Sequence, residues 1–297
     1  MRVAARFVVP VSALLIVFGT PSASVAWGTE GHRSITRRAV DALPQPLREF
    51  FSADGDFVVD HVIDPDLWRI MDLEGRLGAE GPNHYFDIDG LGEPRPFSRV
   101  PRDRRAFLAR YGTSRAGEAG RLPWQAADVF DRLVASLRNT GRGSRVVAAT
   151  DARYFAAVLA HYVEDAHVPF HASTNHDGQL SGQRGIHARF ESDLVRRNAE
   201  TLVLVPVRVD TVGPIVDVMF DTIVASEASV AAILDADRRA ARGSTVYDDG
   251  YYRRFFQDVR VVLQDRLSHA ASSVASILVS AWRAAGSPLL AGRGGRP

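Results

Sequence analysis

The sequence of 297 residues predicts an all-α fold in a single domain, and three observations support this prediction. The segment from Tyr251 to Trp282 carries apolar side chains at intervals of three and four residues, as a helix does when one face packs on a core. The segment from Trp124 to Leu137 repeats this pattern. The β-prone run at residues 202–209 is short and has no partner strand, so we do not expect a sheet.

The first 26 residues have the pattern of a secretory signal peptide. Arg2 and Arg6 precede an apolar run of about 12 residues, and small residues lead up to Ala26. This run is shorter than the roughly 20 apolar residues that a membrane-spanning helix needs. We therefore expect cleavage after Ala26, a mature chain that begins at Trp27, no transmembrane span, and a secreted or periplasmic location.

Composition and chain length restrict how the protein is stabilised, what it binds and how many domains it has. The chain has no cysteine, so disulfides cannot stabilise it after export. Without the predicted signal peptide it carries 34 basic and 35 acidic residues, a formal charge of −1, which argues against nonspecific binding of nucleic acid. A mature chain of about 270 residues can form one large core. We expect one domain at residues 27–288 and a disordered tail at residues 289–297.

The remaining helices follow from apolar spacing and from the positions of proline and glycine. Residues 90–121 are rich in Arg, Pro and Gly, and we expect a long surface segment there with one helix. In chain order, helices are expected after Trp27 as far as Ala42, at 47–51, at 57–63, at 104–111, in the run that ends near Asp165, after Gly185, and from Pro214 to about Arg239.

Five of the nine histidines lie between His161 and Glu191. His161 and Asp165 are four residues apart, as are His187 and Glu191, so a helix places each pair on one face. An imidazole and a carboxylate on one face can bind a divalent cation. A single such pair is more often a surface salt bridge. Two pairs with His171 between them indicate a metal site.

Further metal-ligand candidates are spread along the chain. Because one zinc ion takes three or four protein ligands, the full set suits two or three ions. The four other histidines, His61, His167, His176 and His269, are expected to be structural or exposed. The candidates are five imidazoles and three carboxylates: His32, Asp66, His84, His161, Asp165, His171, His187 and Glu191.

In this order, the motifs together resemble the superfamily of zinc-dependent phospholipases C and single-strand-specific nucleases, through nearly all of the mature chain. That superfamily has an all-α fold and three zinc ions. The motifs that carry the resemblance are Trp27 at the predicted cleavage point, Gly31-His32, Pro65-Asp66-x-x-Arg69, His84-Tyr85-Phe86-Asp87, His161-x3-Asp165-x5-His171 and Gly185-x-His187-x3-Glu191.

The resemblance implies a ligand set for each of the three zinc ions. The α-amino and carbonyl groups of Trp27 hold the first ion together with His32. Asp66, His84 and His161 hold the second, and Asp165 bridges these two ions. The third ion is held by His171, His187 and Glu191. Because cleavage creates the free α-amine, we expect export and metal assembly to be coupled.

Charge and metal chemistry then predict a reaction. Three zinc ions, three carboxylates and one hydroxide leave a charge of about +2, which suits a phosphate diester. Zinc lowers the pKa of water to about 7, and paired metal ions stabilise the attacking and leaving oxygens. We expect Asp66 to orient or deprotonate the nucleophile. Arg69 either holds a phosphate oxygen or pairs with a carboxylate. The resemblance adds Glu30 as a catalytic candidate and Tyr85 and Asp87 as substrate-binding residues.

The sequence therefore predicts a zinc-dependent phosphodiesterase whose substrate stays open. Glu191 and the absence of cysteine resemble the phospholipases C, whereas Arg69 resembles the nucleases. Leu67 and Gly81 stand where the phospholipases place the aromatic residues of a choline site. The prediction leans slightly to a phospholipase C, as a monomer that touches membrane surfaces transiently. The alternatives are an endonuclease that cuts single-stranded nucleic acid to leave 5′-phosphates, and a zinc-binding protein without turnover.

Overall fold

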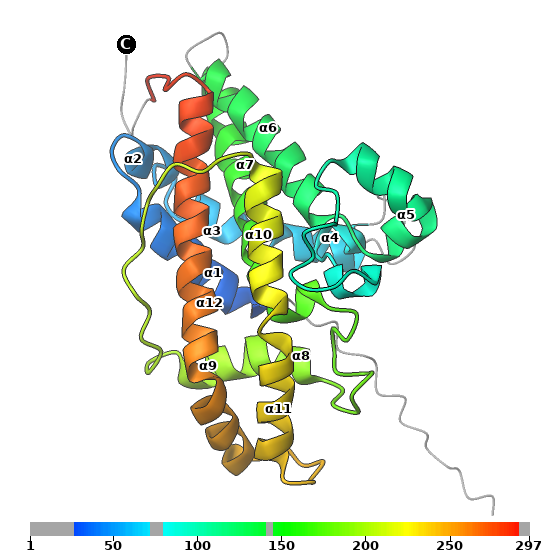
Figure 1. Cartoon of the computed structure of the whole chain (residues 1–297). Coiled ribbons are helices and arrows are strands. Elements are labelled where there is room, and N and C mark those ends of the chain that lie inside the picture. Colours follow the sequence, from blue (N-terminus) through cyan, green and yellow to red (C-terminus); the bar gives the residue numbers. More distant parts are fainter. Residues whose placement is uncertain (1–26, 72–79, 141–144, 291–297) are drawn as a thin grey trace, which may run out of the picture.

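The computed structural model describes residues 27–71, 80–140 and 145–290, and within these ranges it confirms the all-α fold (Figure 1). No β-strand occurs among these residues; the nearest feature is one isolated bridge between Phe86 and Gly120. The α-helices are α1 (Gly28–Ala42), α2 (Leu47–Phe51), α3 (Phe57–His61), α4 (Asp64–Met71), α5 (Arg104–Glu118), α6 (Leu122–Asn139), α7 (Arg145–Ala166), α8 (Ile186–Ala188), α9 (Leu194–Asn198), α10 (Ile215–Glu227), α11 (Val230–Ala241) and α12 (Asp249–Ala284). Short 3₁₀ turns are η1 (Gly81–Asn83), η2 (Ile88–Leu91) and η3 (Pro169–Ala172), and η4 (Arg189–Asp193) is a π-turn.

Helix α7 is the central element of the fold. It packs against α1, α3, α6, α10 and α12, and every residue from Ala156 to Ala166 is buried. A helix that is buried on all sides is normally apolar all round. Helix α7 instead buries His161, Glu164 and Asp165 completely. Charged groups in such a position need partners or a metal ion, so the core of this protein is also the place to look for its site.

Two apolar clusters flank that position. In the first, the rings of Phe86 and Trp124 meet edge to face, with centroids 5.4 Å apart. In the second, Phe190 lies between Trp27 and Phe255, with centroids 6.5 Å from each. The long helix α12 supplies its first half to the second cluster and its last turns to the first. Because the end of α7 belongs to the first cluster and the residues after it to the second, the histidine-rich stretch lies between the two.

An extended strap follows α9 and runs beside α12 (Figure 1). It contains the β-prone run at residues 202–209, which lies in no strand, as the sequence predicts. Its backbone N–H groups are satisfied by serines spaced four residues apart on one face of α12. The four bonds run from Val205 to Ser268 (3.2 Å), from Arg208 to Ser272 (3.2 Å), from Asp210 to Ser276 (3.1 Å) and from Val212 to Ser280 (3.0 Å).

Two expected helices have different limits. The helix expected from Pro214 to Arg239 is two helices, because α10 ends at Glu227 and α11 begins at Val230. The end of α10 is anchored sideways: the hydroxyl of Ser226 donates to the carbonyl of Ala166 at 2.7 Å, and Glu227 pairs with Arg95. The helix expected at 104–111 continues as α5 to Glu118 after a break at Gly112, whose φ of 73° and ψ of 165° are not helical.

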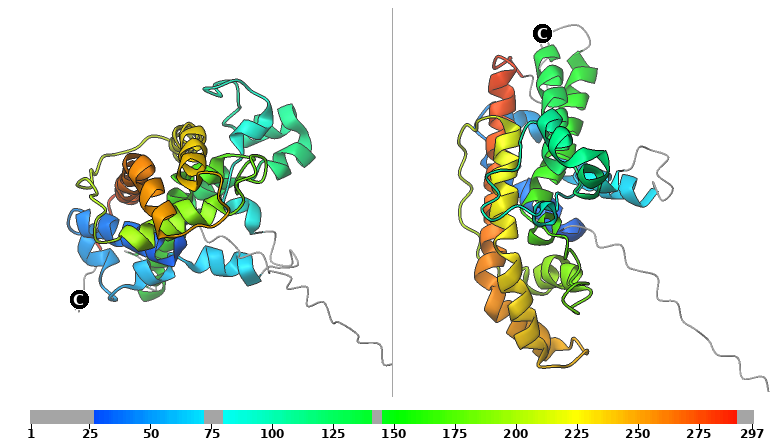
Figure 2. Two further views of the ribbon diagram at one scale, coloured as in Figure 1. Left: turned by 90° about the horizontal axis from the view of Figure 1, so that it is seen from below. Right: turned by 45° about the vertical axis from the view of Figure 1, so that its right-hand side comes forward.

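Figure 2 shows α4 projecting from the side of the bundle, away from α12. None of the helices within the described ranges has the length and apolar character to cross a membrane. The predicted signal peptide at residues 1–26 lies outside these ranges, as do the last seven residues of the predicted tail.

Candidate metal centre

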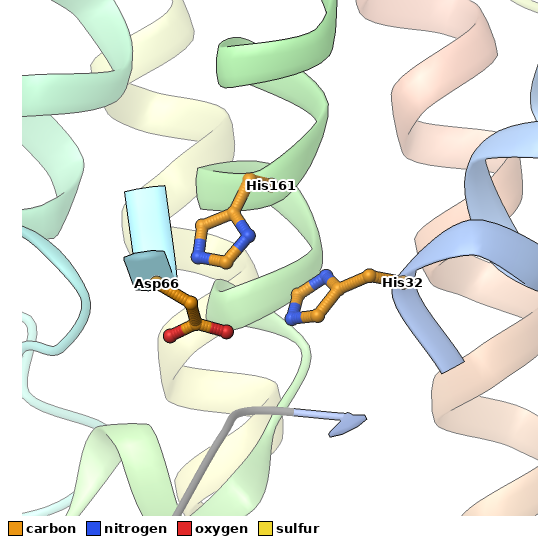
Figure 3. A group of neighbouring side chains, drawn as sticks. All are labelled: His32, Asp66 and His161. Atoms are coloured by element: carbon orange, nitrogen blue, oxygen red, sulfur yellow. The ribbon is translucent and has the colours of Figure 1, made fainter. Parts of the chain in front are cut away.

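Three groups of buried side chains have the composition of metal sites. The first joins His32 from α1, Asp66 from the first turn of α4, and His161 from near the C-terminal end of α7 (Figure 3). Each residue offers one ligand atom, and these atoms lie within 4.8 Å of one another. The His32 and His161 rings stack, with centroids 4.3 Å apart and planes 19° apart. Three elements that are distant in sequence thus bring two imidazoles and a carboxylate to one point.

The second group contains His84, His161 and Asp165. His84 follows η1 directly, and its Nδ1 lies 2.9 Å from Oδ2 of Asp165, while Nε2 of His161 lies 3.2 Å from the same oxygen. The other oxygen of Asp165 lies 3.7 Å from Nε2 of His32 and 3.5 Å from Nδ1 of His171. Asp165 therefore faces histidines of all three groups.

The third group contains His171, His187 and Glu191. Proline follows Val168 and ends α7, so that η3 presents His171 from a turn. His187 and Glu191 lie at the start of the helical segment after Gly185, and Nε2 of His187 is 2.9 Å from Oε1 of Glu191. The rings of His171 and His187 meet edge to face at 5.0 Å. His171 donates from Nδ1 to the carbonyl of His84 at 2.6 Å, which leaves its Nε2 as the possible metal ligand.

The three groups together contain all eight side chains that the sequence singles out as metal ligands. The partition differs from the expected one, because His32 joins Asp66 and His161, and His161 is shared by two groups. Trp27 stands at the start of α1 with its side chain fully buried. Its α-amine exists only in a chain cleaved after Ala26, so its role as a ligand stays a prediction.

The residues present fit a divalent metal ion. Buried nitrogen and oxygen atoms normally have hydrogen-bond partners, and those without a partner need an explanation. Several ligand atoms in these groups are buried without one, and nitrogen and oxygen donors of these types suit zinc and related ions. The atoms are Nε2 of His32, Nδ1 of His161, Oδ1 of Asp165 and Oδ2 of Asp66.

The protonation states of three candidate ligands in the metal-free protein also favour metal binding. Burial lowers the pKa of His171 to about 4 and that of His187 to about 3, and it holds the pKa of His32 well below the usual range. These imidazoles are therefore neutral at pH 7, as a ligand must be. Burial alone would also lower the pKa of His84, but hydrogen bonds to Asp165 and Glu80 raise it to about 9.

A carboxylate that the sequence analysis missed orients the first group. Glu164 is fully buried, and its Oε2 lies 2.5 Å from Nδ1 of His32. Thr36 donates to the other oxygen at 2.6 Å, and the indole N–H of Trp27 donates to the Glu164 carbonyl at 2.9 Å. Because Nδ1 is engaged, Nε2 of His32 faces the metal group. The available signal was a second acidic residue, next to Asp165, in an apolar helix.

A cavity of about 670 Å³ opens beside the second and third groups. His84, His171 and His187 line it, and so do the predicted residues Arg69, Tyr85 and Asp87. Both expected roles of Arg69 are compatible with its position, because it reaches the cavity and its Nη2 lies 3.1 Å from Oδ1 of Asp66. Burial, with the nearby charge of Asp89, raises the pKa of Asp87 to about 8. Asp87 therefore enters the cavity as a neutral hydrogen-bond donor at pH 7.

Glu30 is not among the residues that line the cavity, and its catalytic role stays a prediction. Its side chain is 80% exposed, and its nearest ion pair is with Arg33 at 4.0 Å. Residues two apart on a helix point in nearly opposite directions. Since His32 points into the core, Glu30 must face solvent.

The remaining histidines take the structural or exposed positions expected of them. His167 is buried, with Nδ1 against the carbonyl of Val163 at 2.8 Å and Nε2 against the hydroxyl of Ser273 at 3.2 Å. His61 pairs with Asp64, and His269 is exposed on α12. His176 is exposed at the rim of the cavity.

No protein-family model matches the chain. The chain is similar to a protein of Bradyrhizobium tropiciagri named "probable serine protease", with 26% identity over 59% of this chain and 32% of that protein. The chain thus spans about a third of the length of that relative. The name describes a hydrolase, in agreement with the expected enzyme class at that level.

The similarity contradicts the predicted substrate. The sequence analysis expects a phosphodiesterase, a phospholipase C or a nuclease, whereas the name of the relative points to a protease. The prediction took the net charge of the metal centre as evidence for a phosphate diester, and charge alone does not identify the bond that is cut.

Proposed function

We propose that this chain is a metal-dependent hydrolase with a buried centre of three zinc ions. The observation that supports the proposal most is the convergence of five imidazoles and three carboxylates in three groups beside one cavity. Each group supplies three side chains, the number that zinc sites use when a position is left for water or substrate. The resemblance of the motifs to a superfamily with three zinc ions supports the same number.

The proposed assembly includes processing of the N-terminus. Cleavage after Ala26, on export to the periplasm or the medium, would free the amine of Trp27. Trp27 directly precedes α1, the helix that carries His32, and its indole N–H donates to the carbonyl of Glu164 on α7. A deprotonated α-amine is a competent metal ligand, and in this position it would complete the ligand set around His32.

The residues of the chain then have separate tasks. Zinc, when bound, supplies a Lewis acid that activates water near neutral pH. Asp66 has a buried carboxylate whose pKa is raised by burial, and in this proposal it would orient the attacking water. Arg69 extends from the same helix into the cavity, where its guanidinium can stabilise negative charge that develops on the substrate. Asp87 and Tyr85 line the same cavity and could bind polar groups of the substrate.

Serine-based catalysis is the second candidate, because the relative is named a serine protease. Ser273 and His167 are in contact at 3.2 Å, which is the start of a catalytic arrangement. However, Nδ1 of His167 is bonded to a backbone carbonyl where a triad has a carboxylate, and neither residue lines the 670 Å³ cavity. We therefore propose metal-activated water as the nucleophile, and a peptide bond as the first bond to test.

The test uses the processed chain that begins at Trp27, loaded with zinc. Its activity is measured on denatured casein and, in parallel, on single-stranded DNA and phosphatidylcholine. Each assay is repeated after full removal of metal by a chelator, and again after treatment with a fluorophosphonate reagent that blocks reactive serines. We expect hydrolysis that is lost with the metal, restored by zinc, and insensitive to the serine reagent.

Two controls separate the candidates. Ser273→Ala removes the hydroxyl that would act as the nucleophile in the Ser273–His167 arrangement, and we expect full activity from this variant. Asp165→Asn removes the carboxylate that faces all three groups, and we expect loss of at least 100-fold in kcat/KM, about 3 kcal/mol. Hydrolysis that survives complete metal removal, or that is lost in Ser273→Ala, would refute the proposal.

A further inference from the structure

We infer that a buried ion pair between Arg189 and Asp237 is the positioning device of the metal group formed by His171, His187 and Glu191. This inference rests on the proposed zinc centre. Arg189 lies between His187 and Glu191 in the chain, at the first residue of the π-turn η4. Its side chain is buried and leaves the metal group in the direction of α11 and α12.

The ion pair is part of a closed hydrogen-bond network. Nη2 of Arg189 lies 3.1 Å from Oδ1 of Asp237, and Nε donates to the hydroxyl of Tyr251 at 3.0 Å. The same hydroxyl donates to Oδ1 of Asp237. The guanidinium also stacks on Tyr247, with its central carbon 3.9 Å from the ring centroid. Arg189 is 5% exposed and Asp237 is 1% exposed, so solvent screens neither charge.

The network also fixes the loop that leads to His187. Arg189 donates to the carbonyl of Arg184 at 2.7 Å and to that of Gln183 at 3.1 Å. The side-chain amide of Gln183 reaches Oδ2 of Asp237 at 2.6 Å and the carbonyl of Leu234 at 2.8 Å. The loop between His171 and His187, which forms one wall of the cavity, is thereby tied to α11.

The local backbone leaves little freedom to this arrangement. Gly185 has a φ of 81°, and a Cβ atom there would lie 2.9 Å from Nη1 of Arg189. Any other residue would be strained at this φ, and its Cβ would displace the guanidinium. The π-turn that follows is a feature that often marks functional segments of helices. Together they set the direction in which His187 and Glu191 leave the helix.

Energetics supports a positioning role over a purely stabilising one. A buried ion pair gains little net stability, because the desolvation of two charges offsets their attraction. Apolar residues of similar size would hold η4 against α11 equally well. The planar guanidinium of Arg189 instead fixes relative positions, because it bonds two loop carbonyls, Asp237 and Tyr251 at once. Partners of this kind behind metal ligands typically change metal affinity by about 10- to 100-fold.

The test compares zinc content and affinity in full-length processed protein. The variants are Asp237→Asn, which keeps the shape and removes the charge, Tyr251→Phe, which removes one hydroxyl, and Arg189→Lys, which keeps the charge and removes the fork. Zinc per chain is measured by elemental mass spectrometry, and affinity by competition with a chelator. We expect three zinc ions in the wild type, and in Asp237→Asn and Arg189→Lys one ion weakened by about 10- to 100-fold with two unchanged.

Arg153→Lys is the matched control. Arg153 is also a buried arginine, bonded to the carbonyl of Phe50 and to Asp54, and it stacks on the Phe50 ring at 4.7 Å. It lies on α7 about 12 Å along the helix from His161, at 1.5 Å per residue. We expect a lower melting temperature in Arg153→Lys with three zinc ions of normal affinity.

The outcomes separate this inference from the proposal on which it rests. Wild-type protein without zinc would overturn the proposed centre. Three zinc ions of unchanged affinity in Arg189→Lys and Tyr251→Phe, with only the melting temperature lowered as in Arg153→Lys, would overturn the positioning role alone. Should Asp237→Asn not fold, the two milder variants decide.

Discussion

Replacing Asp165 by asparagine tests the charge balance of the candidate metal centre without any metal present. Asp165 is fully buried and has imidazole nitrogens of four histidines within 3.7 Å. Burial alone would raise the pKa of Asp165. The charges of His161 and His171, together with hydrogen bonds from His161 and His84, outweigh burial and hold this pKa well below the usual range. The substitution keeps the shape of the side chain and removes its charge.

The expected loss of stability follows from His84. Its pKa of about 9 exceeds the usual 6.5, and after the opposing effect of burial the hydrogen bond to Asp165 is the largest cause. Each pKa unit corresponds to 1.36 kcal/mol, so the protonated imidazole contributes about 3 kcal/mol. Breaking one partner of a buried pair typically costs about 3–5 kcal/mol, which agrees. For a domain of this size, 3 kcal/mol lowers the melting temperature by roughly 6–12 °C.

The pH dependence of the stability loss shows whether protonated His84 is its cause. A raised histidine pKa contributes stability that is fully present below pH 6.5 and lost as the pH rises through about 9. The difference between wild type and Asp165→Asn should therefore be largest near pH 6 and much smaller at pH 9.5. Urea unfolding in excess chelator, followed by circular dichroism at both pH values, measures it. A difference that is absent at pH 6, or that is as large at pH 9.5 as at pH 6, would refute the reasoning.

Three further predictions concern the metal. Chelation of the wild-type protein should lower its melting temperature in differential scanning fluorimetry, because each site at 100 times its Kd adds about 2.7 kcal/mol, and an unchanged temperature would contradict metal binding to the folded state. Glu164→Gln should weaken the binding of one zinc ion by about 10- to 100-fold in chelator competition, whereas Thr36→Val should leave it within about threefold. A chain that keeps one extra residue before Trp27 should lose one zinc ion per molecule by elemental mass spectrometry; three ions in that form would exclude the α-amine as a ligand.

Much of the fold could be predicted from local sequence, because each helix has to bury an apolar stripe. The stripe from Tyr251 to Trp282 locates α12 within two residues at each end. The break after Glu227 could not be predicted this way, because its anchors are Ala166 and Arg95, which are distant in sequence. The strap beside α12 could not be predicted for the same reason. Its backbone N–H groups are satisfied by serine side chains of α12, and no pattern within the strap sequence reveals those partners.

The candidate ligands could be predicted because metal chemistry restricts residue types, and helical spacing restricts their positions. The side chains that hold these ligands in position are harder to predict from the sequence. Glu164 and Asp237 are acidic residues on helices, and a sequence does not show whether such a residue faces solvent or a buried partner. Glu30 shows the converse case, since a match in type and spacing made it a candidate, whereas its side chain is exposed to solvent.

Which bond the proposed hydrolase cuts is a separate question from which residues form its site. A zinc centre activates water and neutralises developing charge in both phosphoryl and acyl transfer. The eight candidate ligands therefore do not distinguish between the two reactions. Selection between substrates must come from the cavity wall, where Asp87 is protonated at neutral pH and Arg69 is held by Asp66. The acidic residues Glu118 and Asp177 also line the cavity, so its wall favours an anionic substrate less than the bare metal centre does. The chemistry of the centre therefore supports hydrolysis as a class, and the contrast between casein and the phosphodiesters has to be measured at this wall.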